Sequence, residues 1–365
     1  MSVRCVPFLP FALRSSGGFS NYLRSMVFVT GATGLVGRYL VDELLRAGEE
    51  VRAVCRPESN RIAVHRFLEE NGTDAHALQW VEGSIHDGFF LEEAMAGCER
   101  VYHCAAMVSF HPKDAETMMS INRDATGLLV NAMLHTGVEE LVHVSSVAAL
   151  GRKPGEPVHE DVPFEDGRDV SHYARSKFAA ELEVWRGQEE GLRVLAVNPV
   201  IVLGEGDFSR SSSMLFTLVH RGLSWYPIGT NGFVAARDVA RACTVLADQG
   251  CWGERFVLCA ENASYQQLMV WMAEALDVPA PSRPLKAWML GAAWRLSALW
   301  ERLTGRRAPI SKESVENTSK DHRYATTKLE DVLKAKGVDW AYEPVQTTIQ
   351  TTVPAVLNAL GPVKK

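Results

Sequence analysis

Short apolar runs alternate with amphipathic stretches from Met26 to about Asn198. The apolar runs are short and rich in β-branched residues, as strands buried on both faces of a sheet are, and they lie at Val27–Thr30, Val51–Cys55, Ala77–Val81, Val101–Cys104, Leu141–Ser145 and Val194–Asn198. Between them lie patterns of helical periodicity, at Leu35–Ala47, Phe89–Ala96, Ala115–His135 and Ala174–Glu189. Strands that alternate with helices are typical of a parallel sheet with right-handed crossovers. The first half of the chain therefore predicts an α/β fold with a Rossmann-type, doubly wound parallel sheet.

This alternation stops after Asn198. Residues 204–233 are rich in glycine and serine, which predicts a loop, a short helix at Met214–Arg221 and another loop. Beyond them the pattern predicts helices at Ala235–Ala247, Tyr265–Leu276 and Leu285–Leu303, a strand at Glu254–Leu258 and a mostly helical tail from Ser311 to Leu360. We therefore expect a sheet domain at 26–203 and a smaller, mostly helical lobe at 204–365, of which 235–260 packs back on the sheet.

The first 25 residues differ from the rest. Arg4 precedes an apolar run, as in a secretory signal, but Pro7 and Pro10 interrupt that run and no clear small-residue cleavage site follows. The first strand begins directly at Met26. We interpret 1–25 as a disordered extension, or as a stretch ahead of a natural start at Met26.

Composition narrows the class of protein. The chain has 365 residues, of which 47% are hydrophobic and 22% charged, and this excludes disordered, collagen-like and coiled-coil chains. A net charge of −6 gives no reason to expect nucleic acid as a partner. Seven cysteines without a CxxC pair indicate free thiols in a reducing compartment, the cytoplasm. Histidines are scattered without ligand spacing, so we expect no metal site.

The strongest local signal is a glycine loop between the first strand and the first helix. Gly31 permits a tight turn, Gly34 lets backbone amides approach a pyrophosphate, and Gly37 permits close packing of helix on strand. The free amides and the dipole at the helix start attract a diphosphate. Strand, turn and helix follow one another as a dinucleotide site requires.

The next strand bears on which dinucleotide binds. An acidic residue at its end would hold the ribose of NAD, but Val51–Cys55 is followed by Arg56 and Pro57. A guanidinium at that place pairs with a 2′-phosphate through charge-assisted hydrogen bonds. We therefore favour NADP, with NAD as the alternative.

Tyr173 and Lys177 stand four residues apart, on one face of a predicted helix. The pKa of a phenol is ordinarily near 10, and a neighbouring ammonium lowers it toward the range of a proton carrier. Ser145 and Ser146 end the fifth strand, at the edge where open α/β sheets bind ligands. Together these groups could polarise a carbonyl and protonate it as hydride arrives.

These motifs, in this order, resemble those of an extended short-chain dehydrogenase/reductase, in the NAD-dependent epimerase/dehydratase superfamily. The resemblance covers about Met26 to Ala247 and is greatest to the dihydroflavonol-reductase-like and 3β-hydroxysteroid-dehydrogenase-like members. It implies catalytic roles for Ser146, Tyr173 and Lys177, with Asn122 supporting the site. It implies cofactor contacts from Gly31, Thr33, Gly34, Leu35, Val36, Gly37, Arg56, Ser84, Ile85, Cys104, Ala105, Ala106, Tyr173, Lys177, Pro199 and Val200.

The chain departs from the family pattern at three places. Ser84 stands where an aspartate usually contacts adenine, Asn198 replaces the usual arginine before Pro199, and Ala149 and Leu150 replace more polar residues. The last two changes weaken the case for a nucleotide sugar. We expect an NAD(P)-dependent oxidoreductase that interconverts a ketone and a secondary alcohol on a small-molecule substrate. The alternatives are a nucleotide-sugar epimerase or dehydratase with tightly bound NAD, and a non-catalytic dinucleotide sensor. A homodimer is expected by analogy.

The apolar helix at Leu285–Leu303 carries Trp288, Trp294 and Trp300. Arg295 interrupts its apolar run, which argues against a membrane span. Three interpretations stay open: a lid over the substrate, a helix lying on a lipid surface, or a helix packed on the lobe. Met107, Phe110 and His111 are candidates to line the substrate cleft, and His172 faces it in one interpretation.

Overall fold

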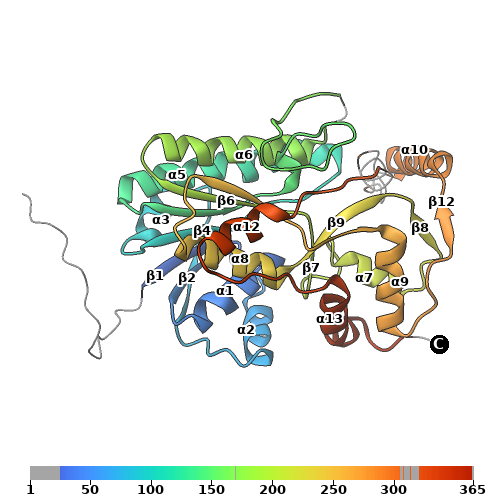
Figure 1. Cartoon of the computed structure of the whole chain (residues 1–365), viewed down its shortest axis with the longest axis horizontal. Coiled ribbons are helices and arrows are strands. Elements are labelled where there is room, and N and C mark those ends of the chain that lie inside the picture. Colours follow the sequence, from blue (N-terminus) through green and yellow to red (C-terminus); the bar gives the residue numbers. More distant parts are fainter. Residues whose placement is uncertain (1–24, 169, 305–306, 308–312, 314–319, 364–365) are drawn as a thin grey trace, which may run out of the picture.

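A computed structural model describes residues 25–168, 170–304, 307, 313 and 320–363. The predictions for 1–25 therefore fall, apart from Ser25, outside the described residues. Figure 1 shows a sheet with helices on both faces in one half of the molecule and a smaller group of helices and short strands in the other.

Seven parallel strands form the central sheet, in the order β10-β6-β5-β4-β1-β2-β3. Their bounds are β1 Met26–Thr30, β2 Glu50–Cys55, β3 Leu78–Glu82, β4 Arg100–His103, β5 Glu140–Val144, β6 Arg193–Pro199 and β10 Glu254–Leu258. Each of these strands was expected from its apolar run, and no end differs from the expected end by more than one residue. The predicted doubly wound α/β fold is confirmed.

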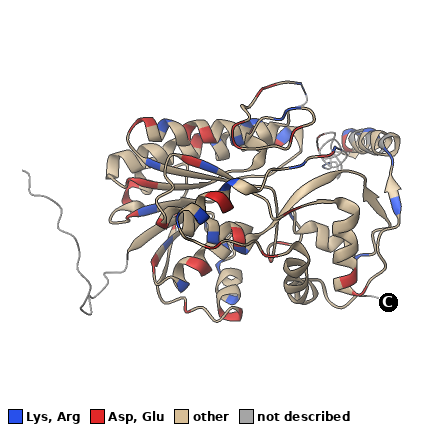
Figure 2. Ribbon diagram, in the orientation of Figure 1, with Lys and Arg blue, Asp and Glu red and all other residues tan. Residues whose placement is uncertain are grey.

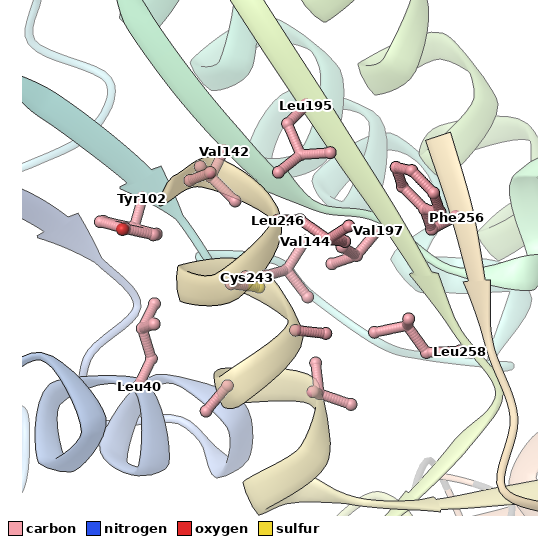
Figure 3. Close-up of a cluster of buried hydrophobic side chains, with 14 of the residues drawn as sticks. Leu40, Tyr102, Val142, Val144, Leu195, Val197, Cys243, Leu246, Phe256 and Leu258 are labelled. Atoms are coloured by element: carbon pink, nitrogen blue, oxygen red, sulfur yellow. The ribbon is translucent and has the colours of Figure 1, made fainter. Parts of the chain in front are cut away.

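Helices cover both faces because each buries one apolar stripe. On one face, α1 (Leu35–Arg46), α2 (Arg61–Glu70) and α8 (Ala236–Asp248) share one apolar cluster with strand side chains such as Val142 and Val144. Figure 3 shows this cluster, with Cys243 and Leu246 of α8 lying against the strands. On the other face, α3 (Gly88–Met95), α5 (Ala125–Thr136) and α6 (His172–Glu189) pack on Phe28 and its neighbours.

One helix was expected over Ala115–His135, and it has a π-helical turn within it. The segment consists of α4 (Ala115–Met119), the π-helical turn Ser120–Asp124 and α5. Such turns insert one extra residue per turn and are frequent at functional sites. Here the turn carries Asn122, which is buried.

The smaller half contains strands that the sequence did not predict. β7 (Ile201–Leu203), β9 (Thr230–Ala235) and β11 (Glu261–Ser264) form one sheet, and β8 (Trp225–Pro227) pairs with β12 (Arg283–Leu285). The prediction of a loop after the helix α7 (Met214–His220) was therefore wrong. These strands are short, and Gly232 interrupts the apolar pattern of β9. The conformation of β9 therefore depends on its pairing with the distant strands β7 and β11.

Helices complete the smaller half. α9 (Tyr265–Leu276) and α13 (Val345–Leu360) share an apolar cluster with α7. α10 (Ala287–Thr304) lies at the outside of this half, next to β12 (Figure 1). The tail was expected to be mostly helical. Within 320–363 it has two helices, α12 (Thr327–Ala335) and α13, joined by the non-helical residues 336–344.

Candidate active site

The carboxyl ends of the parallel strands gather the predicted site residues at one edge of the sheet. The glycine loop follows β1, Cys104 follows β4, Ser145 follows β5 and Val200 follows β6. The chain crosses from β1 to both of its neighbours, β2 and β4, and ligands of open α/β sheets bind where the strand order reverses in this way.

The glycine loop has a shape that only glycine supports at two positions. Gly31 has a φ of +70°, and a Cβ there would lie 2.5 Å from the backbone nitrogen of Ala105. A Cβ on Gly37 would lie 2.1 Å from the carbonyl oxygen of Gly31. Gly34 is exposed and begins α1 without a side-chain cap, so the first amides of the helix, from Leu35 onward, are available to a ligand. This loop fits a diphosphate.

The ends of β2 and β3 also lie at this edge of the sheet, on the side of β1 away from β5. Arg56 follows β2, is exposed and forms an ion pair of 3.1 Å with Glu58. Ser84 and Ile85 follow β3, where Ser84 Oγ accepts a hydrogen bond from the backbone N–H of His86. Arg56 therefore directly follows the strand next to β1 and the glycine loop, and among the described residues its guanidinium pairs with the surface carboxylate of Glu58.

Ser146 and Tyr173 come together with their hydroxyl groups close enough for Ser146 to act on the pKa of the phenol. Ser146 lies just after β5, where its Oγ also accepts from the backbone N–H of Ala148 at 3.2 Å. Tyr173 lies in the first turn of α6, which Ser171 caps by accepting from the N–H of Ala174. The chain thus brings together a serine and a tyrosine that lie 27 positions apart in the sequence.

The pKa of Tyr173 differs from the expectation. Burial raises the pKa of the phenol above its ordinary value, and the hydroxyl of Ser146 opposes that rise. The prediction of a lowered pKa was therefore wrong in direction. Its physical reason is desolvation, which disfavours a phenolate more than the surrounding groups favour it.

Lys177 is buried one helical turn after Tyr173. Its Nζ donates a hydrogen bond of 3.0 Å to the carbonyl oxygen of Val144. Burial lowers its pKa to about 8, while Glu181 and Cys104 oppose that shift. The amine therefore stays largely protonated at neutral pH and places a buried positive charge in the site.

Asn122 joins the loop after β4 to the helix that carries Tyr173. Its Oδ1 accepts from the backbone N–H of Met107 at 2.7 Å, and its Nδ2 donates to the carbonyl oxygen of Met107 at 3.0 Å and to Ser176 Oγ at 2.9 Å. Ser176 in turn donates to the carbonyl oxygen of Tyr173 at 2.8 Å. All of the side-chain donors of Asn122 are thereby used to hold backbone and helix in place.

A second buried network was missed by the sequence reasoning. Asn198 Nδ2 donates to the carbonyl oxygen of Ser146 at 3.0 Å and to Glu181 Oε1. Glu181 is fully buried and forms an ion pair of 3.3 Å with Arg255. The only sequence signals were the position of Glu181 four residues after Lys177 and the departure at Asn198. Asn198 thus holds the backbone of Ser146, and Glu181 places a negative charge near Lys177.

The histidines and cysteines at this edge are uncharged, and both ring nitrogens of His103 bond to the hydroxyls of Thr30 and Thr126. His103 and His143 stack at 5.2 Å between ring centroids, and burial lowers the pKa of both, that of His103 to about 3. Burial raises the pKa of Cys104 to about 12. Within the described part of the chain, no group of three or more His, Cys, Asp or Glu could hold a metal ion.

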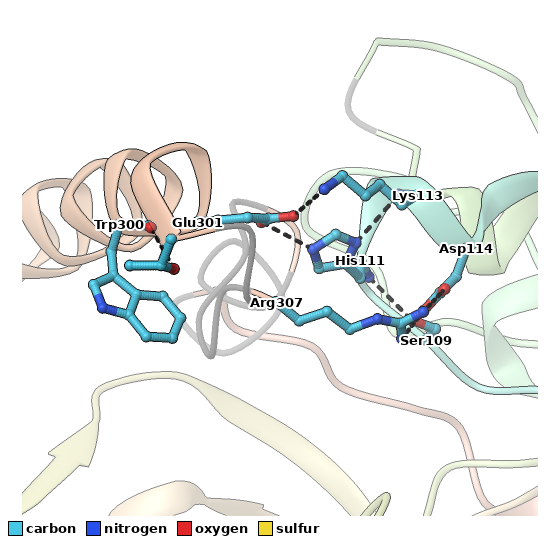
Figure 4. A network of polar contacts seen from close by, with 8 residues as sticks. Ser109, His111, Lys113, Asp114, Trp300, Glu301 and Arg307 are labelled. Atoms are coloured by element: carbon cyan, nitrogen blue, oxygen red, sulfur yellow. Dashed lines mark hydrogen bonds and ion pairs between the residues drawn. The ribbon is translucent and has the colours of Figure 1, made fainter.

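The loop after β4 faces the substrate side of Tyr173. The rings of Phe110 and Tyr173 meet edge to face, with 5.9 Å between their centroids. His111 Nε2 contacts Glu301 Oε2 of α10 at 3.1 Å, which ties this loop to the smaller half (Figure 4). The backbone N–H of His172, beside Tyr173, donates to Glu313 at 3.2 Å. Residues from the smaller half therefore reach the surroundings of the tyrosine.

Residues 27–259 match the NAD-dependent epimerase/dehydratase family. The chain belongs to this family. It is 32% identical over 287 residues to sterol demethylase protein B of Methylococcus capsulatus, covering 77% of this chain and 84% of that protein. It is 30% identical over 264 residues to the bifunctional dihydroflavonol 4-reductase/flavanone 4-reductase of Malus domestica, covering 68% and 75%. The crystal structure of gox2253 superposes with a TM-score of 0.76 at 28% identity, covering 93% of this chain and 100% of that one.

The expected resemblance to extended short-chain dehydrogenase/reductases is thus confirmed, and the chain is an enzyme of the NAD(P)-dependent oxidoreductase class. Members of the epimerase/dehydratase family use a nicotinamide dinucleotide, which agrees with the glycine loop. Among the helices that the structure describes, none has the length and apolar character needed to cross a membrane.

Proposed function

We propose that the protein reduces a ketone, or oxidises a secondary alcohol, with Tyr173 as the group that gives or takes the proton. The observation that carries this proposal is the proximity of the Ser146 and Tyr173 hydroxyl groups, at the strand edge that also holds the glycine loop. A bound nicotinamide would supply or accept the hydride. A relative described as a dihydroflavonol 4-reductase supports the reductive direction.

The residues divide the work as follows. The hydroxyl of Ser146 holds the substrate oxygen beside Tyr173 Oη. Because the pKa of Tyr173 is raised, the phenol carries its proton at neutral pH and donates it to that oxygen in the reductive direction. The ammonium of Lys177, one helical turn away, would stabilise the phenolate left behind and would hold the ribose of a bound cofactor. Asn122 is a positioning residue that acts through Met107 and Ser176.

For the dinucleotide, we propose contacts from the predicted residues of the strand edge. The open amides from Leu35 to Gly37, with Thr33 and Gly34, would hold the pyrophosphate, and Ser84 and Ile85 would hold the adenine side. Cys104, Ala105, Ala106, Pro199 and Val200 would lie along the nicotinamide half. Arg56 supports NADP over NAD, because its exposed guanidinium needs only to exchange Glu58 for a 2′-phosphate.

Ketone reduction is favoured over epimerisation of a nucleotide sugar by the state of Asn198. It is completely buried, and its amide nitrogen is held by the carbonyl oxygen of Ser146 and by Glu181, so that nitrogen is not free to bind a sugar nucleotide. We further propose that the lobe at 204–365 selects the substrate, that two copies form a homodimer, and that the protein works in the cytoplasm. The six described cysteines are free thiols, which supports a reducing compartment.

The test is binding followed by turnover. Isothermal titration of the full chain with NADPH and NADH measures the two affinities directly. A screen of ketones, steroids, flavonoid-like compounds and nucleotide sugars then follows NADPH absorbance. The proposal expects NADPH to bind and at least one ketone to oxidise it. Binding of neither nucleotide, or consumption of a nucleotide sugar alone, would contradict it.

A further inference from the structure

The outer face of α10 is apolar and open to solvent. Trp288, Leu296 and Leu303 are 71%, 66% and 77% exposed, and Trp300 is 42% exposed. Together with exposed Ala292, they recur at spacings of four, four, four and three, which places them along one side of the helix. We call these five residues the α10 stripe. Exposed apolar patches of this kind mark interaction sites in soluble proteins.

The opposite side of the helix packs against the rest of the protein. Leu290 and Ser297 are buried, and the side chain of Glu301 is turned inward to His111 and Lys113. These residues stand seven and four positions apart, on the side away from the α10 stripe. In the part of the chain that the structure describes, the helix therefore packs through one face, and the α10 stripe lies on the other face.

The charges around the stripe show what kind of partner fits it. Residues 283–307 hold six basic residues and a single acidic one, Glu301, whereas the whole chain has a net charge of −6. Arg295 and Arg302 are exposed and flank the stripe, seven positions apart, and Arg283 and Lys286 are exposed just before the helix. Figure 2 shows basic residues on α10 and β12. The surface thus combines apolar side chains, tryptophans and positive charge.

We propose that the α10 stripe docks on an anionic lipid membrane. A helix with a tryptophan- and leucine-bearing face and a basic border lies in the interface between headgroups and acyl chains. Tryptophan favours that depth because its ring is amphipathic. Each exposed lysine or arginine near the surface adds attraction to anionic headgroups, which salt weakens. A second copy of this chain is a poorer partner for the stripe, because pairing two α10 helices would bring their positively charged borders together.

The docked helix is connected to the proton donor. Glu301 contacts His111 Nε2 at 3.1 Å and Lys113 Nζ at 2.5 Å, and Arg307 Nη2 contacts Asp114 Oδ1 at 3.1 Å (Figure 4). Phe110 directly precedes His111, and its ring meets that of Tyr173. The route from the membrane-facing helix to Tyr173 is therefore one short loop. It follows that the substrate is an apolar ketone or alcohol carried by the membrane, a step that rests on the proposed function.

Vesicle sedimentation of the full chain tests the docking. The probes are vesicles of phosphatidylcholine alone and vesicles that also contain phosphatidylglycerol. We expect binding to the anionic vesicles, weaker binding in high salt, and a loss of about tenfold or more in the double variant Leu296→Glu/Leu303→Glu. Phe89→Glu is the matched control, because Phe89 is 87% exposed on α3 and should leave binding unchanged.

Several outcomes would overturn the docking. They are no sedimentation with either vesicle, equal binding by the double variant, or a change from dimer to monomer in the double variant without vesicle binding by the native chain. Melting temperatures check that the variants fold, and Arg295→Ser/Arg302→Ser provides an independent reduction of anionic binding.

Kinetics separates the docking from the proposed reaction. For a ketone that the enzyme reduces, we expect the double variant to raise KM when the ketone is in vesicles and to leave kcat unchanged for a water-soluble ketone. Equal KM values for the vesicle-borne ketone would contradict membrane delivery. If no ketone is reduced but the native chain binds vesicles, the proposed function fails and the docking stands.

Discussion

Asn122 Nδ2 donates a hydrogen bond of 2.9 Å to Ser176 Oγ, and this bond ties the π-helical turn to the helix that carries Tyr173. Removing the amide in Asn122→Ala leaves the backbone N–H and C=O of Met107 without their partners. We expect a loss of about 1–3 kcal/mol in the free energy of unfolding, together with a lower kcat. Chemical denaturation and steady-state kinetics measure the two effects.

Ser176→Ala provides the matched control for this network. It removes the contacts with Asn122 and with the carbonyl oxygen of Tyr173 but leaves the two bonds to Met107 intact. Its effect on stability should therefore be smaller than that of Asn122→Ala. A larger effect of Ser176→Ala would show that the loop after β4 does not depend on Asn122.

Tyr173→Phe removes the proposed proton donor while keeping the aromatic ring that contacts Phe110. We expect kcat to fall by about 10²–10⁴-fold, the usual contribution of a positioned acid or base. Cofactor affinity measured by calorimetry should stay close to that of the native enzyme. Retained turnover would remove Tyr173 from the reaction.

Lys177→Met should abolish activity and yet stabilise the fold. The folded-state pKa of Lys177 is about 8, below its usual value of 10.5, so burial disfavours the charged form. This destabilisation is fully present below pH 8 and is relieved as the pH rises from about 8 toward 10. We therefore expect the Tm of Lys177→Met to exceed that of the native protein at pH 7, by a margin that shrinks toward pH 10. A lower Tm at pH 7 would contradict this sign.

Arg56→Ala tests the choice of dinucleotide. If its guanidinium pairs with the 2′-phosphate, the variant should bind NADPH about 10–100-fold more weakly, in line with a lost charge-assisted bond. The affinity for NADH should change little. Arg66→Ala is a suitable control, since Arg66 is equally exposed on α2 and pairs only with Glu70 in the described contacts. Equal affinities for both nucleotides in the native enzyme would argue against NADP selectivity.

The sheet and its phosphate loop could be predicted from the sequence because their signals are local. Strand runs such as Leu141–Ser145 carry their own apolar pattern, and the three glycines stand at fixed spacing. The strand β9 could not be predicted, since its conformation depends on pairing with β7 and β11. The pKa of Tyr173 was mispredicted for a similar reason. The sequence shows the lysine nearby, but it does not show how completely the fold excludes water.

The buried networks depend on contacts between distant parts of the chain. Glu181 meets Asn198 and Arg255 only because β6 and β10 are adjacent strands. Likewise, Glu301 meets His111 across 190 positions. No periodicity within either segment indicates such a pairing. The sequence therefore pointed to Ser146, Tyr173, Lys177 and Asn122, but not to the contacts that Glu181 and Glu301 make with distant segments.

The position of β10 at the edge of the central sheet limits how the chain can be divided. β10 pairs with β6 only after the chain has passed through β7, β8 and β9 of the smaller half. A fragment that stops before residue 254 would expose the edge of β6 as a template for pairing with other chains. Truncations intended to isolate the nucleotide-binding half should therefore aggregate. During synthesis, the edge strand β10 can pair with β6 only after the ribosome has released Leu258.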